Sequence, residues 1–195
     1  EKAVALGAGE NLTVRFTDTL KTPHLWSTDD PYLYTLRAEI VADGETVDRL
    51  DTVIGIRTVR VTREGMFLNG KKLSLEGANR HQQYPHLGIA VSDAAHAREM
   101  RLLKESGFSL LRLCHYPQSP AVYDACDRLG IVVIECTPGW QWCLESGPFR
   151  TRAYRNIREM IRRDRNHPSV ILWEVSLNET GATEKFMWND KWSGA

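Results

Sequence analysis

The spacing of hydrophobic and polar residues changes once along the chain, near residue 60. Before that point, short runs alternate between apolar and polar positions and are separated by turn residues. These runs cover residues 12–16, 32–41 and 46–56. Such a pattern predicts antiparallel strands that bury one face, as in a β-sandwich.

After residue 60 the pattern predicts a hairpin and then alternating strands and helices. Asn69 and Gly70 suit a type I′ turn, which needs positive φ at both central residues. Ser92 and Ser119 can cap the starts of helices, and Gly107 and Gly130 can end them. The predicted strands are residues 73–77, 110–114, 131–135 and 170–177, and the predicted helices are residues 93–106, 120–129 and 152–165.

Four strand–helix units fit either a doubly wound sheet or half of a (β/α)8 barrel. A nucleotide-binding doubly wound sheet is disfavoured, because no glycine-rich phosphate loop follows the first strand. Polar residues end every predicted strand, as expected where barrel strands meet at one mouth. They are Asn79, Arg80 and His81, then Arg112 and His115, then Glu135, and then Asn178 and Glu179. We therefore expect an α/β fold, with a β-sandwich part at residues 1–60 and the N-terminal half of a TIM barrel at residues 61–195.

Composition narrows the class of partner. The 195 residues include 25 basic and 25 acidic side chains, so the net charge is zero and a nucleic acid or an anionic membrane is not expected as a partner. A neutral sugar fits better. The first residues lack the layout of a signal peptide, and the sequence is compatible with either the cytoplasm or the periplasm. The cysteines form no C-x-x-C pair and are interpreted as small apolar residues rather than disulfide or metal ligands.

Four ordered motifs between about residues 22 and 180 resemble glycoside hydrolase family 2, and its β-galactosidases in particular. Residues 77–88 read GANRHQQYPHLG and residues 111–120 read LRLCHYPQSP. Residues 163–173 read RDRNHPSVILW and lead to Asn178 and Glu179. In the first part, LWS at residues 25–27, PYLY at 31–34 and GIR at 55–57 also match. The resemblance implies an immunoglobulin-like sandwich before a catalytic barrel.

The resemblance also implies a retaining mechanism, which uses two carboxyl groups about 5 Å apart. Glu179 matches the general acid/base of the family, and Asn178 matches the residue that binds the sugar 2-hydroxyl. The alternative is that both residues form a solvated turn at the end of a strand. The attacking carboxylate would lie on a later strand, outside this chain.

Other site residues follow from the same resemblance. His81 and His115 match sugar-binding positions, although either residue could instead be a buried histidine of the core. Arg112 is expected to keep a catalytic carboxylate ionised, or else to form a structural ion pair. Glu135 is either a pocket carboxylate or the buried partner of Arg112. Trp140, with Trp142 nearby, is expected to stack on a sugar ring or to pack within its loop.

Two departures from the family pattern bear on the chemistry. The segment from Trp173 to Glu179 is one residue longer than in the commonest β-galactosidases, so a bulge could re-aim the acid/base. Magnesium-using members carry a Glu and a His after the third strand, where this chain has residues 136–140, CTPGW. We therefore expect no cofactor and no metal, and Mg²⁺ stays open as the alternative although its usual ligands are not recognised. The charged residues 163–167 are interpreted as a structural helix end.

The predicted function is a retaining glycoside hydrolase that cleaves terminal β-linked sugars, with β-galactosides as the first choice. Two alternatives stay open. One is a β-glucuronidase of the same family, and the other is a fragment that binds carbohydrate without catalysis. The expected partners are a β-linked oligosaccharide or glycoside and further copies of the chain in a homo-oligomer.

Overall fold

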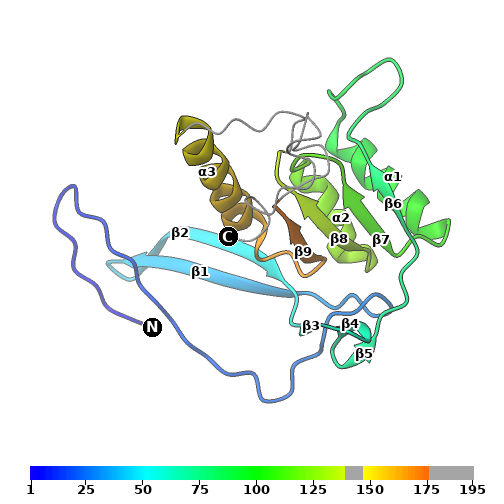
Figure 1. Ribbon diagram of the computed structural model, residues 1–195. Coiled ribbons are helices and arrows are strands. Elements are labelled where there is room, and N and C mark those ends of the chain that lie inside the picture. Colours follow the sequence, from blue (N-terminus) through cyan, green and yellow to red (C-terminus); the bar gives the residue numbers. More distant parts are fainter. Residues whose placement is uncertain (139–146, 176–195) are drawn as a thin grey trace.

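The computed structural model describes residues 1–138 and 147–175 (Figure 1). The first two strands form an antiparallel hairpin of β1 (Tyr34–Ala42) and β2 (Glu45–Ile54), joined by a turn in which Asp43 and Gly44 have φ of 51° and 83°. The predicted strand at residues 12–16 is not formed, so that prediction was wrong. This run is exposed and pairs with no other strand of the described residues, and an isolated strand leaves its backbone hydrogen bonds unmade.

A second small sheet contains β3 (Val59–Thr62), β4 (Gly65–Leu68) and β5 (Lys71–Lys72). The turn between β4 and β5 has positive φ at both Asn69 (51°) and Gly70 (79°), as the sequence predicted. Asn69 also joins this sheet to the segment before it, because its side-chain amide donates to the Trp26 carbonyl at 2.9 Å.

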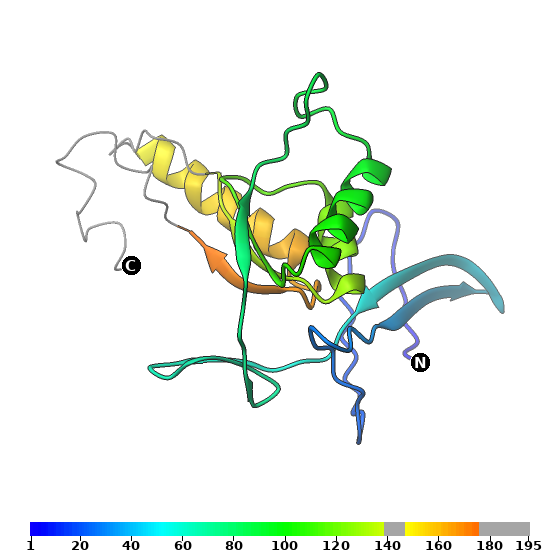
Figure 2. The ribbon, with the colours of Figure 1, turned by 90° about the vertical axis from the view of Figure 1, so that its right-hand side faces the viewer.

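The third sheet is parallel and contains β6 (Gly77–Arg80), β7 (Leu110–Leu113), β8 (Val132–Cys136) and β9 (Val170–Glu174). The strands lie in chain order, without the reversal that a doubly wound sheet requires. Three helices connect them, namely α1 (Asp93–Glu105), α2 (Pro120–Leu129) and α3 (Gly147–Asp164). Figures 1 and 2 show the helices beside a twisted sheet, which is the arrangement of a partial TIM barrel.

The predicted helix bounds agree with the structure where caps define them. The Ser92 side chain accepts from the Ala95 amide at 3.3 Å, and Ser119 accepts from Ala121 at the same distance. Gly130 ends α2 in the left-handed conformation, with φ of 68°. The first barrel strand was placed too early, at residues 73–77. Backbone pairing begins only at Gly77, which lies opposite Leu110.

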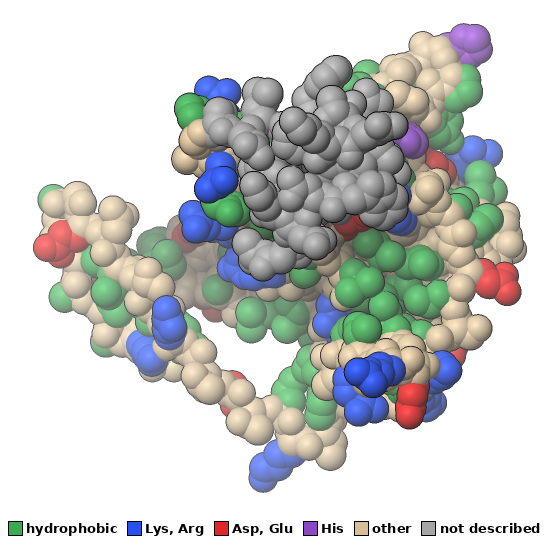
Figure 3. Space-filling view, viewed as in Figure 1, with side chains coloured by type: hydrophobic (Ala, Val, Ile, Leu, Met, Phe, Trp, Pro, Cys, Tyr) green, Lys and Arg blue, Asp and Glu red, His purple; other side chains and the backbone are tan. Residues whose placement is uncertain are grey.

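Two hydrophobic cores lie on opposite sides of the parallel sheet. One packs α1 and α2 against β7 and β8, around Met100, Leu111 and Tyr123. The other joins the β3–β5 sheet to the barrel strands and is built around Trp26, which is fully buried. Figure 3 shows apolar side chains gathered above the β3–β5 sheet, which carries basic side chains on its outer side. Within the described residues, no helix combines the length and the apolar character needed to cross a membrane.

Candidate active site

The carboxyl ends of the four parallel strands bring one layer of polar side chains together. Residues paired across a sheet point to the same face, and the pairs here are Asn79 with Arg112 and Cys136 with Glu174. Arg112 connects the two pairs, since it contacts both Asn79 and Glu174. Arg112 is level with Ile134 and Leu172 in the sheet, and Cys136 and Glu174 lie one step further toward the carboxyl ends on the same face.

Arg112 and Glu174 form a bidentate ion pair in the middle of this layer. Arg112 Nε and Nη2 donate to the two Glu174 carboxylate oxygens at 2.7 and 2.6 Å, and the Cys136 thiol donates to the same carboxylate at 2.8 Å. Burial disfavours the charged form of Glu174, but these hydrogen bonds outweigh it and hold the pKa below its usual value. The hydrogen bond to Glu174 in turn raises the pKa of Arg112.

Glu174 was missed in the sequence. It could have been recognised as a site residue because it is a charged residue inside an otherwise apolar strand, directly after Trp173. Arg112 forms an ion pair with Glu174 rather than with Glu135, and which of its two predicted roles it fills stays a prediction.

Glu135 lies on the opposite face of the sheet, so its predicted place in the sugar pocket is corrected. It pairs with Trp173 in the sheet and is fully buried behind it, where Tyr123 Oη donates to its carboxyl group at 2.9 Å. Arg163 lies 3.7 Å away, and Asp164 lies against the same carboxyl group. Burial, followed by the contact with Asp164, raises the pKa of Glu135 to about 9. Both causes favour the protonated, uncharged form of Glu135.

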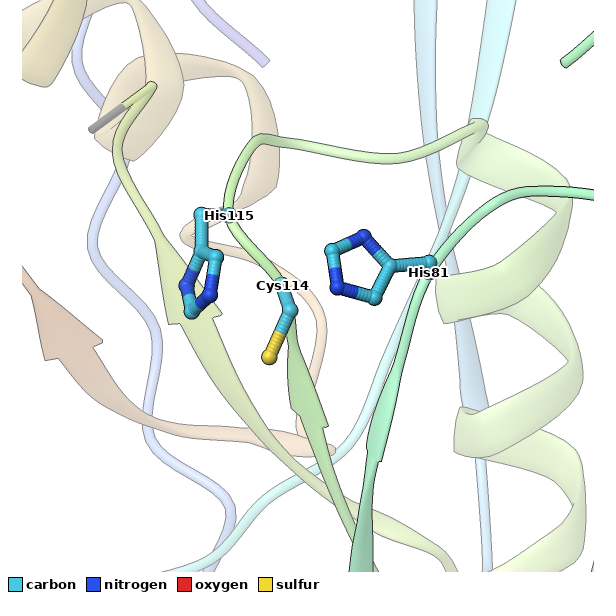
Figure 4. Close-up of side chains that lie close together, drawn as sticks. All are labelled: His81, Cys114 and His115. Carbon is cyan, nitrogen blue, oxygen red and sulfur yellow. The ribbon is translucent and has the colours of Figure 1, made fainter. Parts of the chain in front are cut away.

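His81 and His115 follow β6 and β7 and approach each other at the mouth (Figure 4). Their ring centroids are 5.6 Å apart and the rings are nearly perpendicular, at 85°. His81 is exposed and His115 is partly buried, and the buried Cys114 lies beside them. The structure thus brings the two predicted histidines together, as expected.

Hydrogen bonds between the loops after β6 and β7 hold these histidines in place. The Gln82 amide donates to Tyr116 Oη at 3.0 Å, and its side-chain oxygen accepts from the Ser119 amide at 2.7 Å. Gln118 Nε2 donates to the Arg80 carbonyl at 2.8 Å. These hydrogen bonds connect the two loops directly.

Arg80 connects the loop after β7 to helix α1. It is buried and forms an ion pair with Glu99 of α1 at 2.6 Å, and its guanidinium also contacts Gln118 and His96. Burial, and then the nearby Arg80 charge, lowers the pKa of His96, which favours the neutral imidazole. Arg80 is a positioning residue for the mouth rather than part of it.

The residues that follow α3 are bound to the end of α2. Asp127 accepts from the Ser169 amide at 3.0 Å and from the His167 ring at 2.6 Å, and so fixes the start of β9 to the end of α2. Burial opposes protonation of His167, but the Asp127 contact outweighs it and raises the pKa.

Four of the residues considered for the site lie outside the described residues. They are Trp140, Trp142, Asn178 and Glu179. Their roles stay predictions.

The fold and the site together define a class of protein. A parallel sheet in chain order, flanked by helices and carrying its polar residues at the carboxyl ends of the strands, is the first half of a (β/α)8 barrel with its site at the mouth.

Comparison with known families identifies the branch of that class. A family model described as "Glycosyl hydrolases family 2, TIM barrel domain" matches residues 59–192, and one described as "Glycosyl hydrolases family 2" matches residues 1–57. The chain belongs to glycosyl hydrolases family 2.

Individual relatives carry two kinds of name. A β-galactosidase of Thermoanaerobacter pseudethanolicus is 39% identical over 83% of this chain and 22% of its own length. A putative β-glucuronidase of Formosa agariphila is 37% identical over 80% of this chain and 19% of its own length. The apo structure of Bacteroides uniformis β-glucuronidase 3 is 37% identical with a TM-score of 0.78, over 85% of this chain and 21% of that one. The chain thus spans about a fifth of the length of these proteins.

Proposed function

We propose that the protein containing this chain is a retaining glycoside hydrolase that removes terminal β-linked sugars. The observation that carries this proposal is the polar mouth, where His81, His115 and the Arg112–Glu174 pair meet at the carboxyl ends of the strands. Glu179 follows five residues after Glu174 in the sequence and is proposed as the general acid/base. Asn178 is proposed to bind the 2-hydroxyl, a contact that strengthens in the transition state.

The described side chains suit a neutral sugar. A neutral imidazole can donate through one nitrogen and accept through the other, so His81 and His115 can each bind a hydroxyl group. The Arg112–Glu174 pair offers a polar floor without net charge. The attacking carboxylate would come from a later strand, outside this chain. A homo-oligomer is the proposed assembly of the whole protein.

The first choice of substrate is a β-galactoside, and the second is a β-glucuronide. Glucuronides carry a carboxylate that needs a cation in the site. Among the described residues at the mouth, the Arg112 guanidinium already donates from both Nε and Nη2 to Glu174. Relatives of both names match the chain, so the second substrate is tested beside the first.

Substrate choice is tested with the full-length protein on nitrophenyl β-galactoside and nitrophenyl β-glucuronide. We expect a higher kcat/KM for the galactoside and a first product of β configuration. A higher kcat/KM for the glucuronide would replace the first choice by the second, and an inverted product would contradict the retaining mechanism.

The role of Glu179 is tested with Glu179→Gln in the full-length protein. For an alkyl glycoside, which needs leaving-group protonation, kcat should fall by about 10²- to 10⁴-fold. A dinitrophenyl glycoside should lose far less in its first step, and added azide should give the β-glycosyl azide. Glu105→Gln, at the exposed end of α1, is the matched control and should keep full activity. Equal losses on both substrates without an azide product would refute the assignment.

A further inference from the structure

Beside the two histidines, the mouth contains the Cys114 thiol, which the sugar chemistry does not require. His81, Cys114 and His115 offer two imidazole nitrogens and one thiol, and these ligand atoms all lie within 4.8 Å of one another. The residues come from the ends of two neighbouring strands, and Figure 4 shows the His81 ring directed toward Cys114 and His115. The sequence interpretation treated Cys114 only as a small apolar residue.

This set of ligands has a defined metal preference. Thiolate and imidazole are the ligands of Zn²⁺, with a Zn–S distance of about 2.3 Å and a Zn–N distance of about 2.0 Å. A Zn²⁺ ion at those distances holds its ligand atoms about 3–4 Å apart, so the three side chains need only a small inward movement. Mg²⁺ prefers oxygen ligands and does not suit this set.

The residues around Cys114 can stabilise its thiolate form without repelling a cation. Arg112 Nη1 lies 3.4 Å from the Cys114 sulfur and can donate to the thiolate form that binds metals. The positive charge of Arg112 is balanced by its bidentate contact with Glu174. His81 is exposed, which gives an ion a path to the buried sulfur. Hydrogen bonds between the loops after β6 and β7 connect the two segments that carry the histidines.

We propose that His81, Cys114 and His115 form a binding site for a thiophilic divalent cation, Zn²⁺ above all. Three protein ligands leave a fourth position open for water or a sugar hydroxyl. Because the two histidines are also the proposed sugar-binding residues, a bound Zn²⁺ ion and a sugar should exclude each other. That last consequence rests on the proposed function, whereas metal binding itself does not.

Metal binding is tested with the metal-free full-length protein, by calorimetric titration with ZnCl₂ and by absorption with CoCl₂. We expect one Zn²⁺ per chain at this site and a sulfur-to-cobalt charge-transfer band. Cys114→Ala should remove the band and weaken Zn²⁺ binding by at least about tenfold, since loss of outer contacts alone costs about 10- to 100-fold. Cys126→Ala is the matched control, because Cys126 is buried in α2 beside Met100 and away from the mouth.

The results of these experiments distinguish a failure of the proposed metal site from a failure of the proposed sugar-binding function. Unchanged Zn²⁺ affinity and an unchanged cobalt spectrum in folded Cys114→Ala, checked by circular dichroism, would overturn the metal site. Zn²⁺ binding that depends on Cys114 but is unaffected by saturating galactose would keep the metal site and count against the sugar position of His81 and His115. MgCl₂ in place of ZnCl₂ should give no heat at this site, and Mg²⁺ binding lost in Cys114→Ala would overturn the proposed preference.

Discussion

At the residue scale, two glutamates on neighbouring strands have pKa values shifted in opposite directions because they face opposite sides of one sheet. Glu174 faces the mouth and is held ionised by the Arg112 guanidinium, although burial acts against the charge. Glu135 faces the helices, where burial and Asp164 favour the neutral acid. The same side chain thus serves as an anion in the site and as an uncharged hydrogen-bonding group behind it.

The pKa of Glu135 predicts a specific pH dependence of stability. Its folded-state pKa lies above the unfolded value, so its contribution is complete below about pH 4.5 and is lost as pH rises toward about 9. Glu135→Gln cannot ionise. When the pH is raised from 5 to 8.5, the wild type should therefore lose more unfolding free energy than this variant. The difference between the two losses should exceed about 1 kcal/mol, since one pKa unit corresponds to about 1.4 kcal/mol.

Urea unfolding of the full-length protein at the two pH values measures this change. Glu105→Gln is exposed and should follow the wild type at both values. Parallel pH profiles for Glu135→Gln and the wild type would show that Glu135 is ionised in the folded protein.

At the element scale, the segments around Trp26 and Gly55 fasten the first hairpin to the barrel. Arg57 donates to the carbonyl groups of Pro168 and Val170 at 2.5 Å each, just before and at the start of β9. Trp26 Nε1 donates to the Asp127 carbonyl near the end of α2 at 2.7 Å. These bonds connect positions more than 100 residues apart and leave little space between the segments.

Gly55 shows how tight this junction is. A Cβ atom at Gly55 would lie 2.6 Å from Pro168 Cβ, so Gly55→Ala should destabilise the protein by about 1–3 kcal/mol. Gly147→Ala is the control, since a Cβ there meets nothing within 4 Å and its effect should stay within about 0.5 kcal/mol. Thermal unfolding of both variants measures the difference. Equal melting temperatures would mean that the junction can adjust.

At the scale of the whole molecule, the described chain leaves sheet edges and apolar surface uncovered. Strands β6 and β9 each pair on one side only within the described residues. The hairpin β1–β2 exposes Leu36, Ile40 and Leu50 by more than half of their surface. Open edges and exposed apolar side chains favour association with other chains.

Residues 1–195 produced by themselves should therefore associate or unfold, and should not hydrolyse a nitrophenyl β-galactoside. Light scattering after size exclusion and a nitrophenol assay measure the two properties. A stable monomer with turnover and a retained anomer would show that the mouth of this chain is sufficient for catalysis.

The sequence determined the features that depend on neighbouring residues. The bounds of α2 and the start of α1 were predicted correctly, because Ser92, Ser119 and Gly130 act within one turn of the helix. The Asn69–Gly70 turn was predicted for the same reason. The family also followed from the sequence, since its motifs are local strings of residues. The division of the chain at residue 60 stays a prediction.

Only the tertiary structure decided which face of the sheet each polar strand residue occupies. A shift of one residue reverses every side chain of a strand, and the pairing that fixes the register joins distant segments. Glu135 and Glu174 are therefore distinguished by β8–β9 pairing, and Arg112 finds its partner 62 residues away. The start of β6 and the group of His81, Cys114 and His115 depend on the same long-range contacts.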